Sequence, residues 1–232
     1  MSIAVNHALF GIYPYICLSV FLIGSLIRFD REPYTWRSGS SQLLRRRQLA
    51  WGSNLFHVGI LVIFVGHTGG LLTPLVVFET LGISHEAKQL MAIIIGGVAG
   101  VMCLVGLLML LHRRLTDPRI LRTSTFADIA VLVLILIQLL LGLSSIFVSL
   151  NHLDGGEMVA LMSWAQHIVT FRPGAAEFVL GTDPIFKLHL VLGMTLFLIF
   201  PFTRLVHIWS APIWYLGRRG YQIVRTRRTG KA

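Results

Sequence analysis

Long apolar stretches alternate with short polar connections along the whole chain. Each stretch is long enough to cross the hydrocarbon core of a bilayer, about 30 Å, as an α-helix. They cover approximately residues 8–28, 49–73, 89–111, 126–150 and 185–209. A helix satisfies its own backbone hydrogen bonds, as the bilayer interior requires. The pattern therefore predicts an all-α integral membrane protein with five transmembrane helices, forming one domain over residues 1–232 with a basic tail at 210–232.

Two features modify this simple pattern. Pro14 and Pro201 lie inside the first and last apolar stretches, and each predicts a kink because proline lacks a backbone N–H. The longest connection, before the fifth stretch, contains a segment at 157–171 with the polarity of a short amphipathic helix at a membrane surface. We expect Trp164 and Phe171 to face the lipid headgroups there.

Basic residues are concentrated on one side of the predicted helices. They occupy the connections after the first and third helices and the tail, at Arg28, Arg31, Arg37, Arg45, Arg46, Arg47, Arg113, Arg114, Arg119, Arg122, Arg218, Arg219, Arg225, Arg227, Arg228 and Lys231. Because cytoplasmic loops carry the excess of positive charge, we predict a periplasmic (outside) N-terminus and a cytoplasmic C-terminus. Membrane lipid headgroups account for these arginines, so nucleic acid is not expected as a partner.

The composition agrees with a membrane protein. The chain is 55% hydrophobic and only 13% charged, whereas soluble domains have about 25% charged residues. The two cysteines, Cys17 and Cys103, lie inside apolar stretches and form no CxxC or CxxCH motif. The sequence therefore contains no disulfide framework, thiolate metal site or signal for covalent haem attachment.

Four of the nine histidines lie within apolar stretches, where an imidazole is costly and usually functional. His57 and His67 belong to the second predicted helix, and His189 and His207 belong to the fifth. On the predicted topology the second helix runs outward and the fifth inward. His57 and His207 then form an inner pair, and His67 and His189 form an outer pair.

The spacing of these histidines differs between the two helices. His57 and His67 are 10 residues apart, which corresponds to about 15 Å and a rotation of about −80° along an α-helix. His189 and His207 are 18 residues apart, which corresponds to about 27 Å on one face of a continuous helix. We therefore expect the two helices to cross rather than to run parallel.

Facing histidines at two depths indicate two haems, each with its iron between the rings of one pair. Two histidines fill both axial positions of the iron, so such a centre transfers electrons and leaves no position open for substrate. Glycines would let the flat macrocycle approach the backbone, at Gly52, Gly59, Gly66, Gly69, Gly70 and Gly193. The alternative is a haem-free transport or structural membrane protein whose histidines form hydrogen bonds between helices.

Several stretches carry a family resemblance. They are IYPYI (12–16), FLIGS (21–25), YTWR (34–37), SNLFHVGIL (53–61), FVGH (64–67), WAQHIVTF (164–171), LHLVLGMTLFL (188–198) and FPFTRLVHIWS (200–210). With these stretches the chain resembles, over nearly its whole length, the cytochrome b (gamma) subunit of bacterial membrane-bound respiratory nitrate reductase. The resemblance implies a multi-pass protein of the bacterial cytoplasmic (inner) membrane, with residues 1–232 as a single dihaem cytochrome b domain.

The same resemblance implies the ligands of two non-covalent, bis-histidine b-type haems. His57 and His207 would hold the iron of the inner haem, and His67 and His189 would hold that of the outer haem. It also implies a quinol-binding site beside the outer haem, formed by His67, Lys88, Gly66 and Gly70. We assign no catalytic residue with certainty from the sequence.

The partners implied by the resemblance lie on the cytoplasmic side. Quinol would be oxidised on the periplasmic side, and its electrons would pass through the two haems to an iron–sulfur (beta) subunit and a molybdenum-containing (alpha) subunit. This chain has no ligand motif for iron–sulfur or molybdenum, so nitrate would be reduced on another subunit. The alternative within the same class is a dihaem cytochrome b anchor of another quinone-linked complex.

Overall fold

The computed structural model describes residues 1–36 and 44–210, and all regular structure within these ranges is helical. The predicted basic tail therefore lies, apart from Ser210, outside the described residues. Five helical segments are long and apolar enough to cross a membrane, which confirms the all-α class and the five spans. They are Ile3–Arg31, Arg46–Leu72, His85–Thr116, Phe126–Asn151 and Pro184–Phe202.

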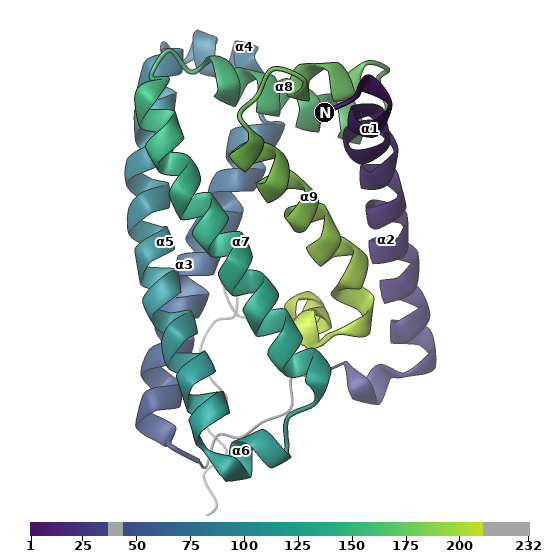
Figure 1. The fold of residues 1–232 in the computed structure, drawn as a ribbon, viewed down its shortest axis with the longest axis vertical. Coiled ribbons are helices and arrows are strands. Elements are labelled where there is room, and N and C mark those ends of the chain that lie inside the picture. The colour runs from purple at the N-terminus through teal and green to yellow at the C-terminus, as the bar shows by residue number, and fades with distance from the viewer. Residues whose placement is uncertain (37–43, 211–232) are drawn as a thin grey trace, which may run out of the picture.

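The long helices form an elongated bundle (Figure 1). They are α2 (Tyr13–Arg31), α3 (Arg46–Leu72), α5 (His85–Thr116), α7 (Phe126–Asn151) and α9 (Pro184–Ile199). Helix α3 packs against α5, α5 against α7, α7 against α9, and α9 against α2. One end of the bundle carries α1 (Ile3–His7), α4 (Leu75–Thr80) and α8 (Gly156–Val169), and the other end carries α6 (Pro118–Arg122) (Figure 1).

Side-chain caps define where several helices begin. The hydroxyl of Ser84 accepts a hydrogen bond from the backbone N–H of Ala87, so α5 begins before the apolar stretch that was predicted at 89–111. Thr125 and Asp128 form a reciprocal capping box at the start of α7. Each of these helices therefore starts at a polar residue that satisfies backbone N–H groups at the membrane boundary.

Glycines bring α3 and α5 into close contact. A Cβ atom on Gly59 would lie 2.7 Å from both the backbone oxygen of Ala99 and the Cβ of Cys103, and one on Gly52 would lie 3.3 Å from the oxygen of Gly106. In lipid there is no hydrophobic driving force between helices, so they associate through close van der Waals contact. Small residues allow the two backbones to come close enough for this contact. Gly52 and Gly59 thus serve helix packing, and the expectation that they face a macrocycle is wrong.

The first span is irregular just before Pro14. A π-helical turn, η1 (Ala8–Ile12), precedes α2, and Pro14 has no N–H to donate to the carbonyl of Phe10. The indole N–H of Trp164 donates to that oxygen instead, at 2.9 Å. The amphipathic helix predicted at 157–171 is confirmed as α8, but Trp164 is only 3% exposed and does not face the headgroups.

The fifth span is not the continuous helix that was predicted over 185–209. Helix α9 ends at Ile199 and is followed by two 3₁₀ segments, η4 (Phe200–Phe202) and η5 (Arg204–Ser210). Pro201 cannot continue the α-helical hydrogen bonds, and Thr203 is extended, with φ −124° and ψ 177°. The chain therefore changes direction between His189 and His207, and the rise of 27 Å expected for a continuous helix does not apply.

The end of the bundle near α6 is held by charged contacts. The carboxylate of Asp117 accepts from the backbone N–H of Arg119 at 3.0 Å and lies 3.4 Å from the guanidinium of Arg45, just before α3. Burial raises the pKa of Asp117, but the Arg119 hydrogen bond and the two guanidiniums outweigh it, so the pKa is lowered overall. An ionised Asp117 thus joins the start of α3 to the end of α5.

The close packing at Gly59 predicts a position-specific cost of adding a methyl group. Gly59→Ala should lower the free energy of unfolding by about 1–3 kcal/mol, because the new Cβ overlaps the α5 backbone. Gly96→Ala is the matched control, since nothing lies within 4 Å of its added Cβ and alanine favours a helix by up to about 1 kcal/mol. Thermal unfolding in detergent measures both, and equal stabilities would contradict the prediction.

Candidate functional site

The inner histidines face each other from α3 and η5. The ring centres of His57 and His207 lie 6.4 Å apart, with an angle of 76° between the ring planes. The Nδ1 of His57 bonds the backbone oxygen of Ser53 at 2.7 Å, and the Nδ1 of His207 bonds that of Arg204 at 2.5 Å. Both Nε2 atoms therefore keep a lone pair that can bind a metal.

The outer histidines face each other from α3 and α9. The ring centres of His67 and His189 lie 6.1 Å apart, with an angle of 40° between the ring planes. The Nδ1 of His67 bonds the backbone oxygen of Ile63 at 2.9 Å. The ring of His189 instead accepts a hydrogen bond from a side chain: the amide nitrogen of Gln138 on α7 donates to its Nε2 at 3.3 Å.

Both ring distances fit a metal ion bound between two imidazoles. Metal–nitrogen bonds to histidine are about 2 Å long, so two opposed ligating nitrogens lie about 4 Å apart and their ring centres roughly 6 Å apart. Among the described residues no group of three or more His, Cys, Asp or Glu side chains could hold a bare metal ion. A histidine pair suits haem iron, because the porphyrin supplies the other four ligands.

Glycines beside the outer pair face open space. Added Cβ atoms on Gly66, Gly69 and Gly70 would meet nothing within 4 Å, in contrast to the packed glycines of the α3–α5 contact. Gly193 differs from these three, because its added Cβ would lie 3.2 Å from the amide nitrogen of Gln138. The residues next to His67 thus leave the room that a flat macrocycle or a quinol ring needs.

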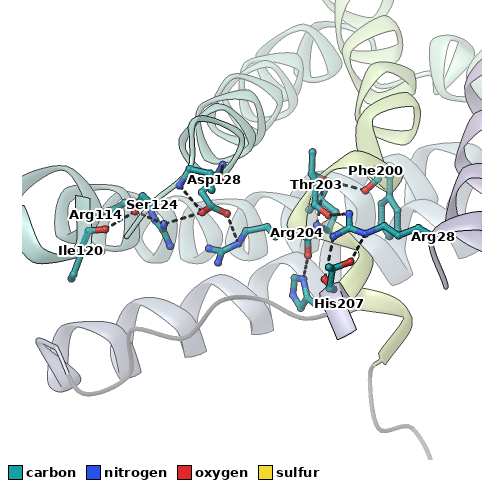
Figure 2. Close-up of polar contacts among 12 residues, drawn as sticks. Arg28, Arg114, Ile120, Ser124, Asp128, Phe200, Thr203, Arg204 and His207 are labelled. Carbon is teal, nitrogen blue, oxygen red and sulfur yellow. Dashed lines mark hydrogen bonds and ion pairs between the residues drawn. The ribbon is translucent and has the colours of Figure 1, made fainter. Parts of the chain in front are cut away.

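Charged side chains from two other helices hold the segment that carries His207. Figure 2 shows Asp128 between Arg204 and Arg114, with Oδ1 3.1 Å from Arg204 Nε and Oδ2 3.8 Å from an Arg114 guanidinium nitrogen. From α2, a single nitrogen of Arg28 donates to the backbone oxygens of Pro201, at 2.6 Å, and Thr203, at 2.9 Å. The break after α9 is therefore fixed from both sides.

Lys88 is buried at the start of α5 and is only 7% exposed. Its ammonium donates to the backbone oxygen of Gly70 at 3.1 Å, contacts the sulfur of Met162, and lies 3.8 Å from the centre of the Phe78 ring. Gly70 is three residues beyond His67, so Lys88 lies at the same end of α3 as the outer pair. The structure thus brings together Lys88 and Gly70, two of the residues predicted to share a quinol site.

The side chains at these sites that were not identified from the sequence include Gln138, Gln166 and Arg28. Gln166 on α8 donates to the oxygens of Leu71 and Thr73 and so caps the end of α3. The sequence could have indicated a role for Gln138, because it is a single amide in a long apolar stretch and buried amides in membranes need hydrogen-bond partners. It could not have indicated one for Arg28, because Arg28 resembles the other arginines of its connection.

Five spans with two facing histidine pairs at different levels define a multi-pass membrane protein whose interior is suited to haem. Comparison with known proteins identifies the family. A model of the family described as "Nitrate reductase gamma subunit" matches residues 6–227, and the chain belongs to this family. The family is known as a cytochrome b component.

The relatives cover almost the same length as this chain. The respiratory nitrate reductase 1 gamma chain of Escherichia coli (strain K12) is 54% identical over 222 residues, which are 96% of this chain and 98% of that protein. The nitrate reductase gamma chain of Bacillus subtilis (strain 168) is 40% identical over 223 residues, 96% of this chain and 99% of that protein. These relatives are gamma chains of an oxidoreductase complex.

The contacts of Arg28 predict that it stabilises the break after α9. Arg28→Ala should lower the free energy of unfolding by about 2 kcal/mol, because it removes charge-assisted hydrogen bonds to two backbone oxygens. Arg31→Ala, an exposed arginine on the same helix, is the control and should change stability by less than about 0.5 kcal/mol. Chemical unfolding in detergent compares the two, and similar losses would count against this role.

Proposed function

We propose that this chain is the membrane-anchor cytochrome b subunit of a quinol-dependent respiratory nitrate reductase. Residues 1–232 form a single domain with two non-covalent b-type haems as cofactors. The chain oxidises quinol at the outer surface of the bacterial cytoplasmic membrane and delivers the electrons to its cytoplasmic face. An iron–sulfur subunit and a molybdenum-containing subunit receive them there, and nitrate is reduced on the latter.

The observation that carries this proposal is the pair of histidine contacts. His57 with His207, and His67 with His189, have ring centres 6.4 Å and 6.1 Å apart at two levels of one bundle. Haem bound between two histidines supplies reversible one-electron transfer with no open coordination position. The backbone bonds at the Nδ1 atoms of His57, His67 and His207 orient those rings and increase their basicity as ligands.

The quinol site lies beside the outer pair. The ammonium of Lys88 has three N–H donors, so it can hold the oxygen of Gly70 and still donate to a quinone or quinol oxygen. His67 has a second ring nitrogen that can exchange its bond to Ile63 for one to the substrate. Gly66 and Gly70 leave open space next to both side chains, where the ring of the substrate fits.

The charge distribution supports the orientation of the chain. Arg45 and Asp117 lie at the end of the bundle near α6, with the other basic connections, and the end near α8 carries most of the acids. The positive-inside rule assigns the arginine-rich end to the cytoplasm. Oxidation of quinol then releases protons outside, and its electrons leave on the inside. Moving electrons inward works against the membrane potential, so the reaction stores about 2.3 kcal/mol of free energy per charge per 100 mV.

Loss of individual histidines tests the cofactors and their pairing. His67→Ala or His189→Ala should remove one and the same haem, and His57→Ala or His207→Ala should remove the other, because each pair shares one iron. Haem stoichiometry and reduced-minus-oxidised spectra of the purified complex measure this. His152→Ala, with an exposed imidazole, is the control and should retain both haems.

Three results would contradict the proposal. Absence of a b-type signal from the unsubstituted complex would exclude the haem assignment. Loss of the same haem in the His57 and His189 variants, with the other haem retained, would refute the pairing. Quinol-dependent nitrate reduction by a complex that lacks this chain would exclude the assigned function.

The position of Lys88 predicts a defect confined to quinol oxidation. Lys88→Ala should lower kcat/KM for quinol roughly 10- to 100-fold, the loss expected for one charge-assisted hydrogen bond, while both haem spectra remain. Lys187→Ala is a matched control, since Lys187 also donates to a backbone oxygen, that of Leu180 at 2.8 Å, in the connection before α9. Steady-state quinol oxidation compares the variants, and an equal effect of both would reject a direct role for Lys88.

A further inference from the structure

Gln138 is an isolated polar side chain in the middle of a membrane helix. It is the only polar side chain between Asp128 and Ser144 on α7. An amide at this depth is costly unless its hydrogen bonds are satisfied within the bundle. Its amide nitrogen lies 3.1 Å from the backbone oxygen of His189 and 3.3 Å from the Nε2 of the same residue. Gln138 therefore touches both the backbone and the ring of one histidine of the outer pair.

Glycines on both helices make room for this contact. A Cβ atom on Gly142, one turn beyond Gln138, would lie 3.0 Å from Cε1 of His189. One on Gly193, one turn beyond His189, would lie 3.2 Å from the amide nitrogen of Gln138. The ring of His189 thus fills the space beside Gly142, and the amide of Gln138 fills the space beside Gly193. These close contacts restrict the movement of both side chains.

His189 differs from the other three histidines in how its ring is held. The Nδ1 atoms of His57, His67 and His207 each bond a backbone oxygen of their own segment. The Nδ1 of His189 is buried with no hydrogen-bond partner, and so is the Oε1 of Gln138 next to it. A donor and an acceptor left without partners in adjacent side chains indicate an arrangement that changes when the imidazole binds a metal.

Resting on the proposed function, we propose that Gln138 is the positioning residue for His189 as a ligand of the outer haem. A turn of the imidazole that brings Nδ1–H to the Oε1 of Gln138 satisfies both unpartnered atoms. The amide nitrogen keeps its bond to the backbone oxygen of His189, and Nε2 becomes free for the iron. Gln138 then has the role that backbone oxygens have for the other three histidines.

This role affects the redox potential of one haem only. In a histidine that binds a metal through one ring nitrogen, the other ring N–H can donate a hydrogen bond to an acceptor. This bond increases the basicity of the ligand and favours the oxidised metal. Removing the acceptor should therefore raise the midpoint potential of the outer haem, and a carboxylate in its place should lower it. The inner haem, whose ligands do not contact Gln138, is an internal reference in the same sample.

The experiment uses the complete purified complex with three variants: Gln138→Leu, Gln138→Glu and Gln48→Leu. Gln48 bonds a backbone oxygen of α5, that of Met109 at 3.1 Å, and is the control for replacing a membrane glutamine. Redox titration followed optically gives both midpoint potentials, and electron paramagnetic resonance reports the orientation of the axial ligand planes. We expect Gln138→Leu to raise and Gln138→Glu to lower the outer potential, with the inner potential unchanged in all three.

Each outcome decides the proposal. Opposite shifts of the outer potential support it, as does loss of the outer haem in Gln138→Leu with retention in Gln138→Glu, which keeps an acceptor. Unchanged outer potentials in both variants, or loss of the outer haem in both, would overturn it. Absence of haem from the unsubstituted complex is a separate result, which would refute the proposed function itself.

Discussion

A backbone carbonyl that loses its helical partner inside a membrane must find another donor, because lipid supplies none. At four places in the described part of the bundle where a helix ends or is broken, a side chain from another helix supplies that donor and so joins the two helices. The donor–acceptor sets are Trp164 with Phe10, Arg28 with Pro201 and Thr203, Lys88 with Gly70, and Gln166 with Leu71 and Thr73.

The break at Pro201 matters most for the site. A continuous helix would carry His207 about 12 Å beyond the level of His57, since its 18-residue interval exceeds the 10-residue interval on α3 by eight residues. Helix α9 instead ends at Ile199, and η5 brings His207 to within 6.4 Å of His57 between ring centres. The change of chain direction after α9 thus reconciles the unequal intervals.

The spans and the proximity of the histidines could be predicted because they follow from hydropathy and from depth along a helix. The departures from regular helix could not. The proline at 201 indicates a disturbance of the helix, but the hydrogen bond from Arg28 to its carbonyl joins positions 173 residues apart in sequence. Trp164 was assigned to the headgroups from its amphipathic segment, whereas the carbonyl that Pro14 leaves free draws its indole inward. Such contacts between distant segments have no local sequence signal.

The two histidine pairs are held in physically different ways. At the inner pair both rings bond the backbone of their own segments, and Asp128 and Arg28 fix the segment of His207 by charge. At the outer pair His189 depends on another helix, and the end of α3 is held by Lys88 and Gln166. The inner pair is therefore held mainly within its own segments and by charge, whereas the outer pair is held by hydrogen bonds from other helices.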